Sequence, residues 1–192
     1  MKIIGITGSI GCGKTYLANI IKKLGFSVYN PDEWVRDLYK KADFLAVIRQ
    51  EFPQVFENNV FNKRKLRNIV FDDNKQLKKL ENIIHPFINK KLKRIIHKFA
   101  QTEDILFLDV ALLYEGNWDI YCDYVIVADV DDKVQMQRVM ERDHISAEDF
   151  KKIIAVQNEK ENTKERADYV IDTGLREGIN KVQLIRFISE IL

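Results

Sequence analysis

Cysteine, proline and tryptophan are scarce in this chain of 192 residues, which contains two, three and two of them, respectively. The cysteines, Cys12 and Cys122, lie far apart and belong to no CxxC pair or histidine-rich cluster. A disulfide framework and a zinc site are therefore disfavoured, and a reducing compartment fits. Gly/Ser-rich linkers, internal repeats and low-complexity tracts are also absent, so we expect one domain, or one domain with a sizeable insertion.

Long hydrophobic runs are missing as well. No stretch approaches the ~18 uninterrupted apolar residues that indicate a membrane-spanning helix. At the N-terminus, the apolar part of MKIIGITGSIGCGK is too short and too soon interrupted for a signal peptide. Hydrophobic residues nevertheless make up 46% of the chain, which is enough to bury a full core. We therefore expect a soluble, cytoplasmic protein that makes no contact with a membrane.

The net charge of +2 conceals an uneven distribution. Residues 63–98 carry twelve Lys and Arg residues against three Asp and Glu residues, whereas residues 103–192 lean acidic. Such a basic helical segment can attract a phosphate-bearing ligand or a nucleic acid, although a solvated helix surface is the ordinary interpretation for most of its lysines. Aromatic residues that would stack on bases do not alternate with these lysines, so we expect no nucleic-acid partner.

Short β-branched runs alternate with longer helical patterns, which is typical of βα units with a parallel sheet. The predicted strands are 2–7, 26–29, 105–110, 124–129 and 169–171. The predicted helices around them are 14–24, 31–41, 133–143, 145–167 and 177–191. Because two of the strands, 105–110 and 124–129, are near-continuous apolar runs, we expect them in the centre of a sheet that helices cover on both faces.

The strand pattern stops between residues 43 and 102. Three helical patterns can be drawn there, at 44–52, 63–71 and 75–99, and Pro86 should kink or divide the last of them. We expect residues 1–42 and 103–192 to form an α/β core of the P-loop type, and 43–102 to form an all-helical insertion that binds the acceptor substrate. Residues 145–162 would be a mobile helical lid that excludes water.

Eight consecutive residues after the first predicted strand carry the most specific signal. They match G-x-x-x-x-G-K-[ST] at every position: Gly8, Ser9, Ile10, Gly11, Cys12, Gly13, Lys14 and Thr15. In such a loop the glycines let backbone N–H groups surround a phosphate, the lysine adds a charge at the β- and γ-phosphates, and the Thr15 hydroxyl can ligate Mg²⁺. A helix that begins at Lys14 also directs its N-terminus at the anion. The sequence therefore predicts that ATP binds here together with Mg²⁺.

The residues that accompany the loop narrow the class of nucleotide-binding protein. Guanine recognition needs an N-K-x-D motif, and the Asn-Lys pairs that begin at Asn62, Asn89 and Asn180 all lack the aspartate. The glycines do not follow G-x-G-x-x-G, so a dinucleotide-binding fold would leave Lys14 and Thr15 unexplained. The small size and the insertion also argue against a motor or transporter ATPase. A small-molecule kinase remains.

Further motifs resemble those of the dephospho-CoA kinases, in the same order and at similar spacings over residues 1–175. They are the loop with Thr7 before it, Asn30-Pro31-Asp32, His85-Pro86, Asp109–Glu115, Gln135–Asp143, Gln157 and Ala167–Asp172. The resemblance implies that ATP phosphorylates the 3′-hydroxyl of the ribose of dephospho-CoA, which gives CoA and ADP in the last step of coenzyme A biosynthesis. Asn30, Ala111 and Thr163 depart from the family's usual Asp, Pro and basic residue. Asp172-Thr173-Gly174 departs from its usual D-N-x-G near the adenine.

The resemblance also implies catalytic and metal-binding roles. Asp32 would accept a hydrogen bond from the 3′-hydroxyl, although an acid in a first helical turn can simply complement the helix dipole. Lys14, Arg138 and Arg142 would neutralise charge on the phosphoryl group, and the two arginines share a helix face because they are four residues apart. Surface ion pairs are the alternative for both arginines. Asp109, with Thr15, would hold the metal ion, unless it is a buried structural acid.

Other matching residues would contact the substrates. Arg142 and Asp172 are the expected nucleotide contacts outside the loop. The expected contacts with dephospho-CoA are Asp32, His85, Leu113, Glu115 and Gln157. For a lone histidine near apolar residues, as at His85, a core position is the common alternative. Cys12 replaces the family's usual serine inside the loop, which would make it an oxidation-sensitive point.

Two competing functions stay open. The chain could be another kinase, acting on a nucleoside, a nucleotide or a shikimate-like alcohol. From a different class, it could be a nucleotide-binding regulator or an RNA-binding protein that uses 63–98 as its contact surface. For assembly, we expect a monomer or a weak homo-oligomer.

Overall fold

The computed structural model describes residues 1–99, 101–114, 116–160 and 163–192, and no helix in these ranges is long and apolar enough to cross a membrane. The chain forms two compact units. Unit 1 comprises Met1–Asn30 and Thr102–Leu192, and unit 2 comprises Pro31–Gln101. The helix that follows the second strand therefore belongs with the insertion, whereas we expected it in the core.

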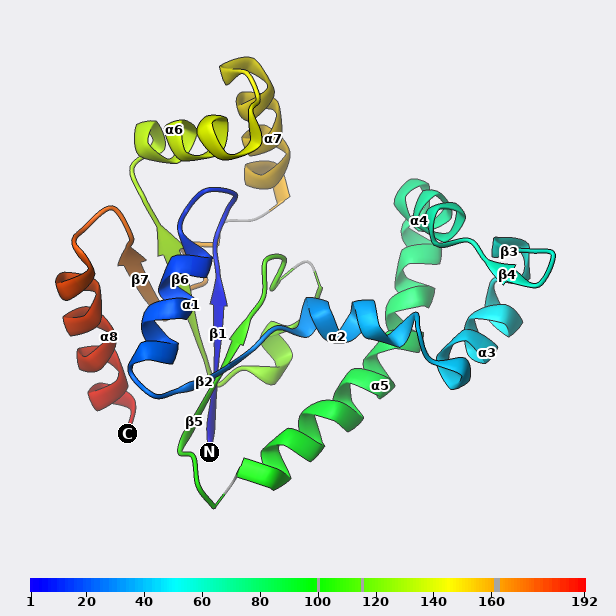
Figure 1. Ribbon diagram of the computed structural model, residues 1–192, viewed down its shortest axis with the longest axis horizontal. Helices are drawn as coiled ribbons and strands as arrows, with labels where there is room; N and C mark the ends of the chain where they lie inside the picture. The colour runs from blue at the N-terminus through cyan, green and yellow to red at the C-terminus, as the bar shows by residue number, and fades with distance from the viewer. Residues whose placement is uncertain (100, 115, 161–162) are drawn as a thin grey trace. The chain divides into compact units, whose positions relative to one another are not determined.

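A five-stranded parallel sheet forms the centre of unit 1 (Figure 1). In the order β2-β5-β1-β6-β7, the strands are Ser27–Tyr29, Ile105–Asp109, Lys2–Thr7, Tyr124–Asp129 and Tyr169–Asp172. Ile6 of β1 lies opposite Asp109 of β5 on one side and Ile126 of β6 on the other. All neighbouring strands are parallel, so the predicted sheet is confirmed.

Apolar side chains on the central strands hold the helices of unit 1 in place. Ile4, Phe107 and Ile126 are fully buried and belong to one cluster with side chains from α1 (Lys14–Lys23) and α8 (Glu177–Ile191). Burial of each such side chain contributes roughly 1.5–3 kcal/mol, so these helices are held mainly by their apolar faces. The carboxyl end of β1, where the phosphate loop begins, is therefore held by the packed core of unit 1.

Two more helices of unit 1 follow β6. They are α6 (Asp132–Asp143) and α7 (Ala147–Lys160), and they pack against each other. Asp131 caps α6, because its Oδ1 accepts the Lys133 N–H at 2.9 Å. The helical segment that we predicted at 145–162 is thus present as α7, and its mobility remains a prediction.

Unit 2 consists mainly of four helices, which are α2 (Pro31–Leu38), α3 (Ala42–Glu51), α4 (Lys63–Asp72) and α5 (Asn74–Phe99). Phe44 and Ile48 of α3 and Ile88 of α5 are almost completely buried. The rings of Phe44 and Phe87 meet edge to face at 5.3 Å. This unit therefore has an apolar core of its own, as the pattern of the insertion indicated.

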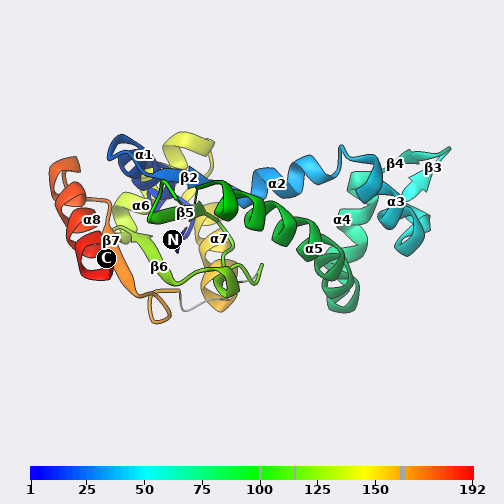
Figure 2. The ribbon, with the colours of Figure 1, turned by 90° about the horizontal axis from the view of Figure 1, so that it is seen from below.

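The insertion is not all-helical, which corrects our prediction. A hairpin of β3 (Phe56–Glu57) and β4 (Val60–Phe61) follows a short 3₁₀ helix at Pro53–Val55 and lies near α3 and α4 in both views (Figure 1, Figure 2). Its turn residues, Asn58 and Asn59, have φ of 48° and 66°. Asparagine tolerates this left-handed conformation, which suits two-residue hairpin turns. The Asn-Asn pair was the sequence signal that we missed.

Pro86 lies inside α5, which is one helix of 26 residues, so the proline does not divide the helix. Proline has no N–H to donate to the carbonyl of Asn82, so one helical hydrogen bond is missing at this point. Tertiary packing overrides the local cost, since Ile88 and Leu92 on the following turns are buried.

Candidate active site

The phosphate loop connects β1 to α1 (Figure 1). Gly8 and Gly13 have φ of 151° and 88°. A Cβ on Gly8 would come within 2.5 Å of the Ala128 carbonyl oxygen, and one on Gly13 within 2.5 Å of the Thr173 hydroxyl oxygen. Both conformation and space therefore require glycine here. The glycines let the loop pack closely against Ala128 and Thr173 in a conformation that other residues rarely adopt.

Gln135 of α6 supports the first half of the loop. Its Nε2 donates to the Ser9 hydroxyl oxygen and to the Ile10 carbonyl oxygen, each at 2.7 Å. The residue is buried, so these hydrogen bonds satisfy an amide that would otherwise be costly to bury. The position of the loop therefore depends on a helix that lies more than 100 residues later in the chain.

Thr173, just after β7, supports the second half. Its hydroxyl donates to the Cys12 carbonyl oxygen at 2.5 Å and accepts a hydrogen bond from Arg138 Nη1 at 3.0 Å. Its carbonyl oxygen accepts from Arg138 Nη2 at 3.1 Å, and its N–H donates to the Asp129 carbonyl oxygen at 2.8 Å. One buried threonine thus links the loop, the end of β6 and an arginine of α6.

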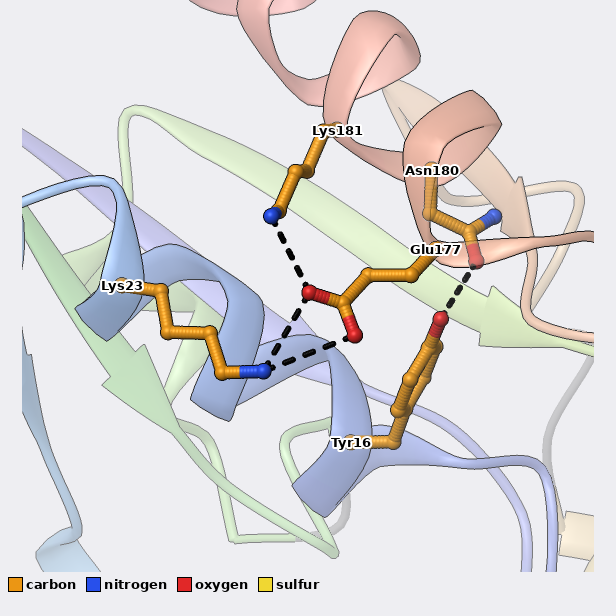
Figure 3. A network of polar contacts seen from close by, with 5 residues as sticks. All are labelled: Tyr16, Lys23, Glu177, Asn180 and Lys181. Carbon is orange, nitrogen blue, oxygen red and sulfur yellow. Dashed lines mark hydrogen bonds and ion pairs between the residues drawn. The ribbon is translucent and has the colours of Figure 1, made fainter.

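A polar network joins α1 and α8 (Figure 3), and one of its residues also binds the segment just before Thr173. Asn180 is fully buried and donates through Nδ2 to the Asp172 carbonyl oxygen at 2.7 Å. Its Oδ1 accepts a hydrogen bond from the Tyr16 hydroxyl at 3.3 Å. Beside this pair, Glu177 forms ion pairs with Lys23 and Lys181. Through Asn180, the turn after β7 is therefore linked to α1, the helix at the end of the phosphate loop.

Arg138 and Arg142 lie on the predicted face of α6, and both line the cavity at the loop. Arg138 binds Thr173 as described. Arg142 pairs with Asp143 through Nε and Nη2, at 2.8 and 2.7 Å. The hydrogen bonds to Asp143 raise the pKa of Arg142 and keep its guanidinium beside that carboxylate. The structure brings both cations to the loop, each with a protein partner.

Lys14 and Asp109 contact each other at the carboxyl edge of the sheet, where Nζ donates to Oδ1. Asp109 ends β5 and Lys14 begins α1, so β1 and its loop place the two side chains together. Thr15, the next residue, lines the cavity. The Asp109 carboxylate and the Thr15 hydroxyl carry oxygens of the kind that Mg²⁺ binds, and this ion takes one or two protein ligands along with water and phosphate oxygens. Among the described residues, no group of three or more His, Cys, Asp or Glu residues could hold a metal ion. A Mg²⁺ ion that is also ligated by the phosphates of a nucleotide does not require such a group.

The cavity at the loop has a volume of about 780 Å³, within the usual range for small-molecule sites. Its lining includes loop residues and both arginines. It also includes residues that we did not predict: Tyr16, Ala111, Leu112, Thr173, Gly174 and Leu175. Leu112 and Leu175 add apolar side chains to a lining that also contains Lys14 and two arginines, which suits a ligand with an apolar part and a polyphosphate.

Two predicted contacts point into the core of unit 1. The side chain of Cys12 is only 1% exposed, and burial raises the pKa of its thiol. Little thiolate forms under those conditions, so the expected oxidation-sensitive point is not supported. Leu113 is fully buried, and a Cβ added to Gly5 would meet its side chain. Leu113 therefore packs against β1, which disfavours the predicted contact with substrate.

The side chain of Asp172 also has a structural role. Its Oδ1 accepts the Gly174 N–H at 2.8 Å, which shapes the turn after β7. The following residues, Thr173 to Leu175, line the cavity instead. Of the other predicted contacts, Glu115 lies outside the described residues, and so does the side chain of Gln157.

Asp32 and His85 belong to unit 2. Asp32 is exposed in the first turn of α2, directly after Pro31. His85 is half-buried on α5, directly before Pro86. Both lie where the sequence placed them, on helices, and their roles remain predictions.

Sequence reasoning missed the residues that position the loop. Gln135 was part of a motif that we noted, but we gave it no role. Thr173 and Asn180 had no recognisable pattern, because their partners lie 161 and 164 residues away in the chain. Only the departure at Asp172-Thr173-Gly174 drew attention to this turn.

A family model of dephospho-CoA kinase matches residues 2–177. The dephospho-CoA kinase of Bartonella henselae is 41% identical over 175 residues, which cover 91% of this chain and 90% of that protein. That of Fusobacterium nucleatum is 35% identical, with 88% of each chain covered.

Solved structures agree with this match. A dephospho-CoA kinase from Campylobacter jejuni has a TM-score of 0.64 at 25% identity, over 98% of this chain and 96% of that one. A structure from Thermus thermophilus has a TM-score of 0.81 at 24% identity, over 100% and 97%, and supports the fold alone. A shikimate kinase from Acinetobacter baumannii reaches only 0.52. With a family model over most of its length and relatives above 30% identity, the chain belongs to the dephospho-CoA kinase family.

Proposed function

We propose that this protein transfers the γ-phosphoryl group of ATP to the 3′-hydroxyl of the ribose of dephospho-CoA, and that it does so in the cytoplasm as a monomer or weak homo-oligomer. The main support is the phosphate loop, whose backbone faces a cavity of about 780 Å³ lined by two arginines. Family membership supports dephospho-CoA over a nucleoside or a shikimate-like alcohol as acceptor.

The loop would bind the ATP phosphates through backbone N–H groups and the N-terminus of α1. Lys14 is in contact with Asp109 in the structure, and it would exchange that carboxylate for a phosphate oxygen when ATP enters. Arg138 and Arg142 would face the phosphoryl group from α6. Phosphoryl transfer needs positioning and charge neutralisation more than covalent chemistry, and these groups supply both.

Thr15 and Asp109 would hold Mg²⁺ through oxygen atoms. When bound, this ion neutralises charge on the phosphates. Asp32 would accept a hydrogen bond from the 3′-hydroxyl and orient it for attack. It follows Tyr29, the last residue of β2, by three positions, so the carboxyl edge of the sheet and the start of α2 are adjacent in the chain.

Acceptor-dependent release of ADP by the purified protein tests the proposal. We expect release with dephospho-CoA and none above background with AMP or shikimate. Rapid release with either alternative, and none with dephospho-CoA, would overturn it. Loss of activity on addition of EDTA, with recovery in excess MgCl₂, would support the metal ligands.

A further inference from the structure

The segment that follows β5 contributes to the cavity at the phosphate loop. Ala111 and Leu112 line this cavity, and they follow Asp109, the carboxylate in contact with the loop lysine, by two and three residues. We call residues 110–114 the β5 wall. Near its start the wall is tied to β1, because the Thr7 hydroxyl donates to the Ala111 carbonyl oxygen at 3.3 Å. The other end of the wall therefore depends on what holds its last residue.

That last residue is Tyr114, and Arg166 contacts it in two ways. The guanidinium carbon of Arg166 lies 3.8 Å from the centre of the Tyr114 ring, and the Arg166 carbonyl oxygen accepts the Tyr114 hydroxyl at 3.0 Å. Arg166 Nη2 also donates to Asp119 Oδ2 at 3.1 Å. Tyr114 is buried, and a planar guanidinium can pack on an aromatic ring in a way that an ammonium cannot. The side chain of Arg166 thus holds the end of the β5 wall.

The chain on both sides of Arg166 is fixed to β6. Lys164 Nζ lies 2.7 Å from Oδ2 of Asp129, the last residue of that strand. Asp168 binds Val125, near the start of the strand, because its N–H donates to the Val125 carbonyl oxygen at 3.0 Å and its Oδ2 accepts the Val125 N–H at 2.7 Å. This stretch therefore runs along β6, and Arg166 is held between its two ends.

The contact between Arg166 and Tyr114 joins two sides of the cavity. In the sheet, β5 and β6 flank β1, the strand from which the phosphate loop begins. All of these residues belong to unit 1. The Asp129 carbonyl oxygen of β6 also accepts the Thr173 N–H at 2.8 Å, and Thr173 lines the same cavity as the β5 wall. Arg166 therefore links the wall on one side of the loop to the strand that holds the turn on the other side.

We propose that Arg166 is a positioning residue for phosphoryl transfer, which acts through the Tyr114 ring to hold the β5 wall against the bound nucleotide. The inference rests on the proposed function, because it takes the cavity to be the ATP site. Arg166 is not among the described residues that line the cavity, so its effect on a nucleotide is indirect. When the guanidinium is removed, the Tyr114 hydroxyl keeps its bond to the backbone of residue 166. The wall should then shift without unfolding, and nucleotide affinity should fall.

A cycle of single and double variants tests this link. Arg166→Met removes the guanidinium, Tyr114→Leu removes the ring, and a third variant carries both changes. Affinity for ADP is measured by titration calorimetry in MgCl₂, without acceptor. We expect Arg166→Met to bind ADP about fivefold more weakly, as for the loss of one partly desolvated cation–π contact. Because Tyr114→Leu already breaks that contact, the double variant should lose no more affinity than Tyr114→Leu alone.

Two control variants separate the ring contact from its neighbours. Asp119→Asn removes the ion pair and leaves the ring contact, whereas Tyr114→Phe removes the hydroxyl and keeps the ring. Both should bind ADP within about twofold of wild type. If Arg166→Met melted at a lower temperature but bound ADP like wild type, the contact would serve stability alone and the inference would be wrong. Losses of affinity that multiply in the double variant would also overturn it.

Failure of the proposed function would look different. In an active enzyme, Arg166→Met should raise the KM for ATP about fivefold and leave the KM for dephospho-CoA within about twofold of wild type. A wild type that binds ADP but does not phosphorylate dephospho-CoA would overturn the proposed acceptor. The calorimetric cycle would still decide the role of Arg166, because it uses the nucleotide alone.

Discussion

The two units carry opposite charge, although both are proposed to bind phosphate groups. Of the 31 Lys and Arg and 29 Asp and Glu residues in the chain, 16 and 9 lie at Pro31–Gln101, which leaves 15 and 20 for unit 1. The formal charges are therefore +7 for unit 2 and −5 for unit 1. Yet the phosphate loop lies in the negative unit.

The two proposed sites correspond to two physical routes to anion binding. Unit 1 would use backbone N–H groups and a helix N-terminus, which need glycine at defined positions and little net charge. Unit 2 offers long cationic side chains, which set no strict spacing in the sequence. A local motif therefore predicts the site in unit 1, whereas in unit 2 only the count of charges indicates an attraction to anions. Substitutions can test whether the division of labour between the units is real.

The largest effect should follow from Lys14→Ala. This change removes the one side-chain charge built into the loop, so we expect phosphoryl transfer to fall on the order of 10³-fold or more, with weaker ATP binding. Steady-state kinetics and nucleotide titration measure both. Lys23→Ala, on the same helix and paired with Glu177 at the surface, should keep nearly full activity. Full activity of Lys14→Ala would contradict the assignment of the loop.

The second-largest effect is expected for Asp32→Asn. A large loss of kcat in this variant would indicate a catalytic group in unit 2. We expect kcat to fall about 10²-fold, because an amide orients the 3′-hydroxyl less well than a carboxylate. The affinities for ATP and dephospho-CoA should stay nearly intact. The control is Asp37→Asn on the same helix, where the carboxylate pairs with Lys40 at 2.8 Å. If the two variants had equal kcat, Asp32 would be merely a first-turn acid.

Thr173→Val tests how unit 1 positions its loop. The change keeps the shape but removes the hydroxyl that joins Cys12 to Arg138, so we expect the KM for ATP to rise about tenfold through a displaced loop. Thr173→Ser keeps the hydroxyl and should stay within about twofold of wild type. A Val variant with a lower melting temperature but an unchanged KM for ATP would show that the contact only stabilises the fold.

The smallest effect is expected for His85→Ala in unit 2. The KM for dephospho-CoA should rise a few-fold, while the KM for ATP stays within about twofold, the pattern of lost acceptor binding. His97→Ala, at the far end of the same helix, is a matched control. If the KM for ATP rose instead, the insertion would serve the nucleotide and our division between the units would be wrong.

Much of the fold could be predicted because its signals are local. Apolar runs such as 105–109 and the glycine loop determine nearby backbone directly, and the parallel sheet follows from their alternation with helices. The hairpin at Phe56–Phe61 was missed because its strands are two residues long, too short for an alternating pattern. At Pro86 the local rule allowed either a kinked or a divided helix, and packing on both sides of the proline favours the single helix α5.

The site was predictable only in part, for a related reason. Loop residues are recognised from one another, since they are neighbours in the sequence. Gln135, Thr173 and Asn180 act on partners more than 120 residues away, and a single sequence contains no trace of such pairs. Leu113 shows the opposite limit, because its place in a motif suggested a contact with substrate, which its burial disfavours.

The order of strands in the sheet also determines when each strand can first pair with a neighbour during synthesis. β1 is made first but pairs with β5 and β6, and Lys2 lies opposite Ile105, which is added 103 residues later. At synthesis rates of about 5–20 residues per second, β1 waits roughly 5–20 s for its first partner. All of Pro31–Gln101 is added during that interval. The nascent chain therefore carries Ile3, Ile4 and Ile6 in an unpaired strand until unit 2 has been synthesised in full.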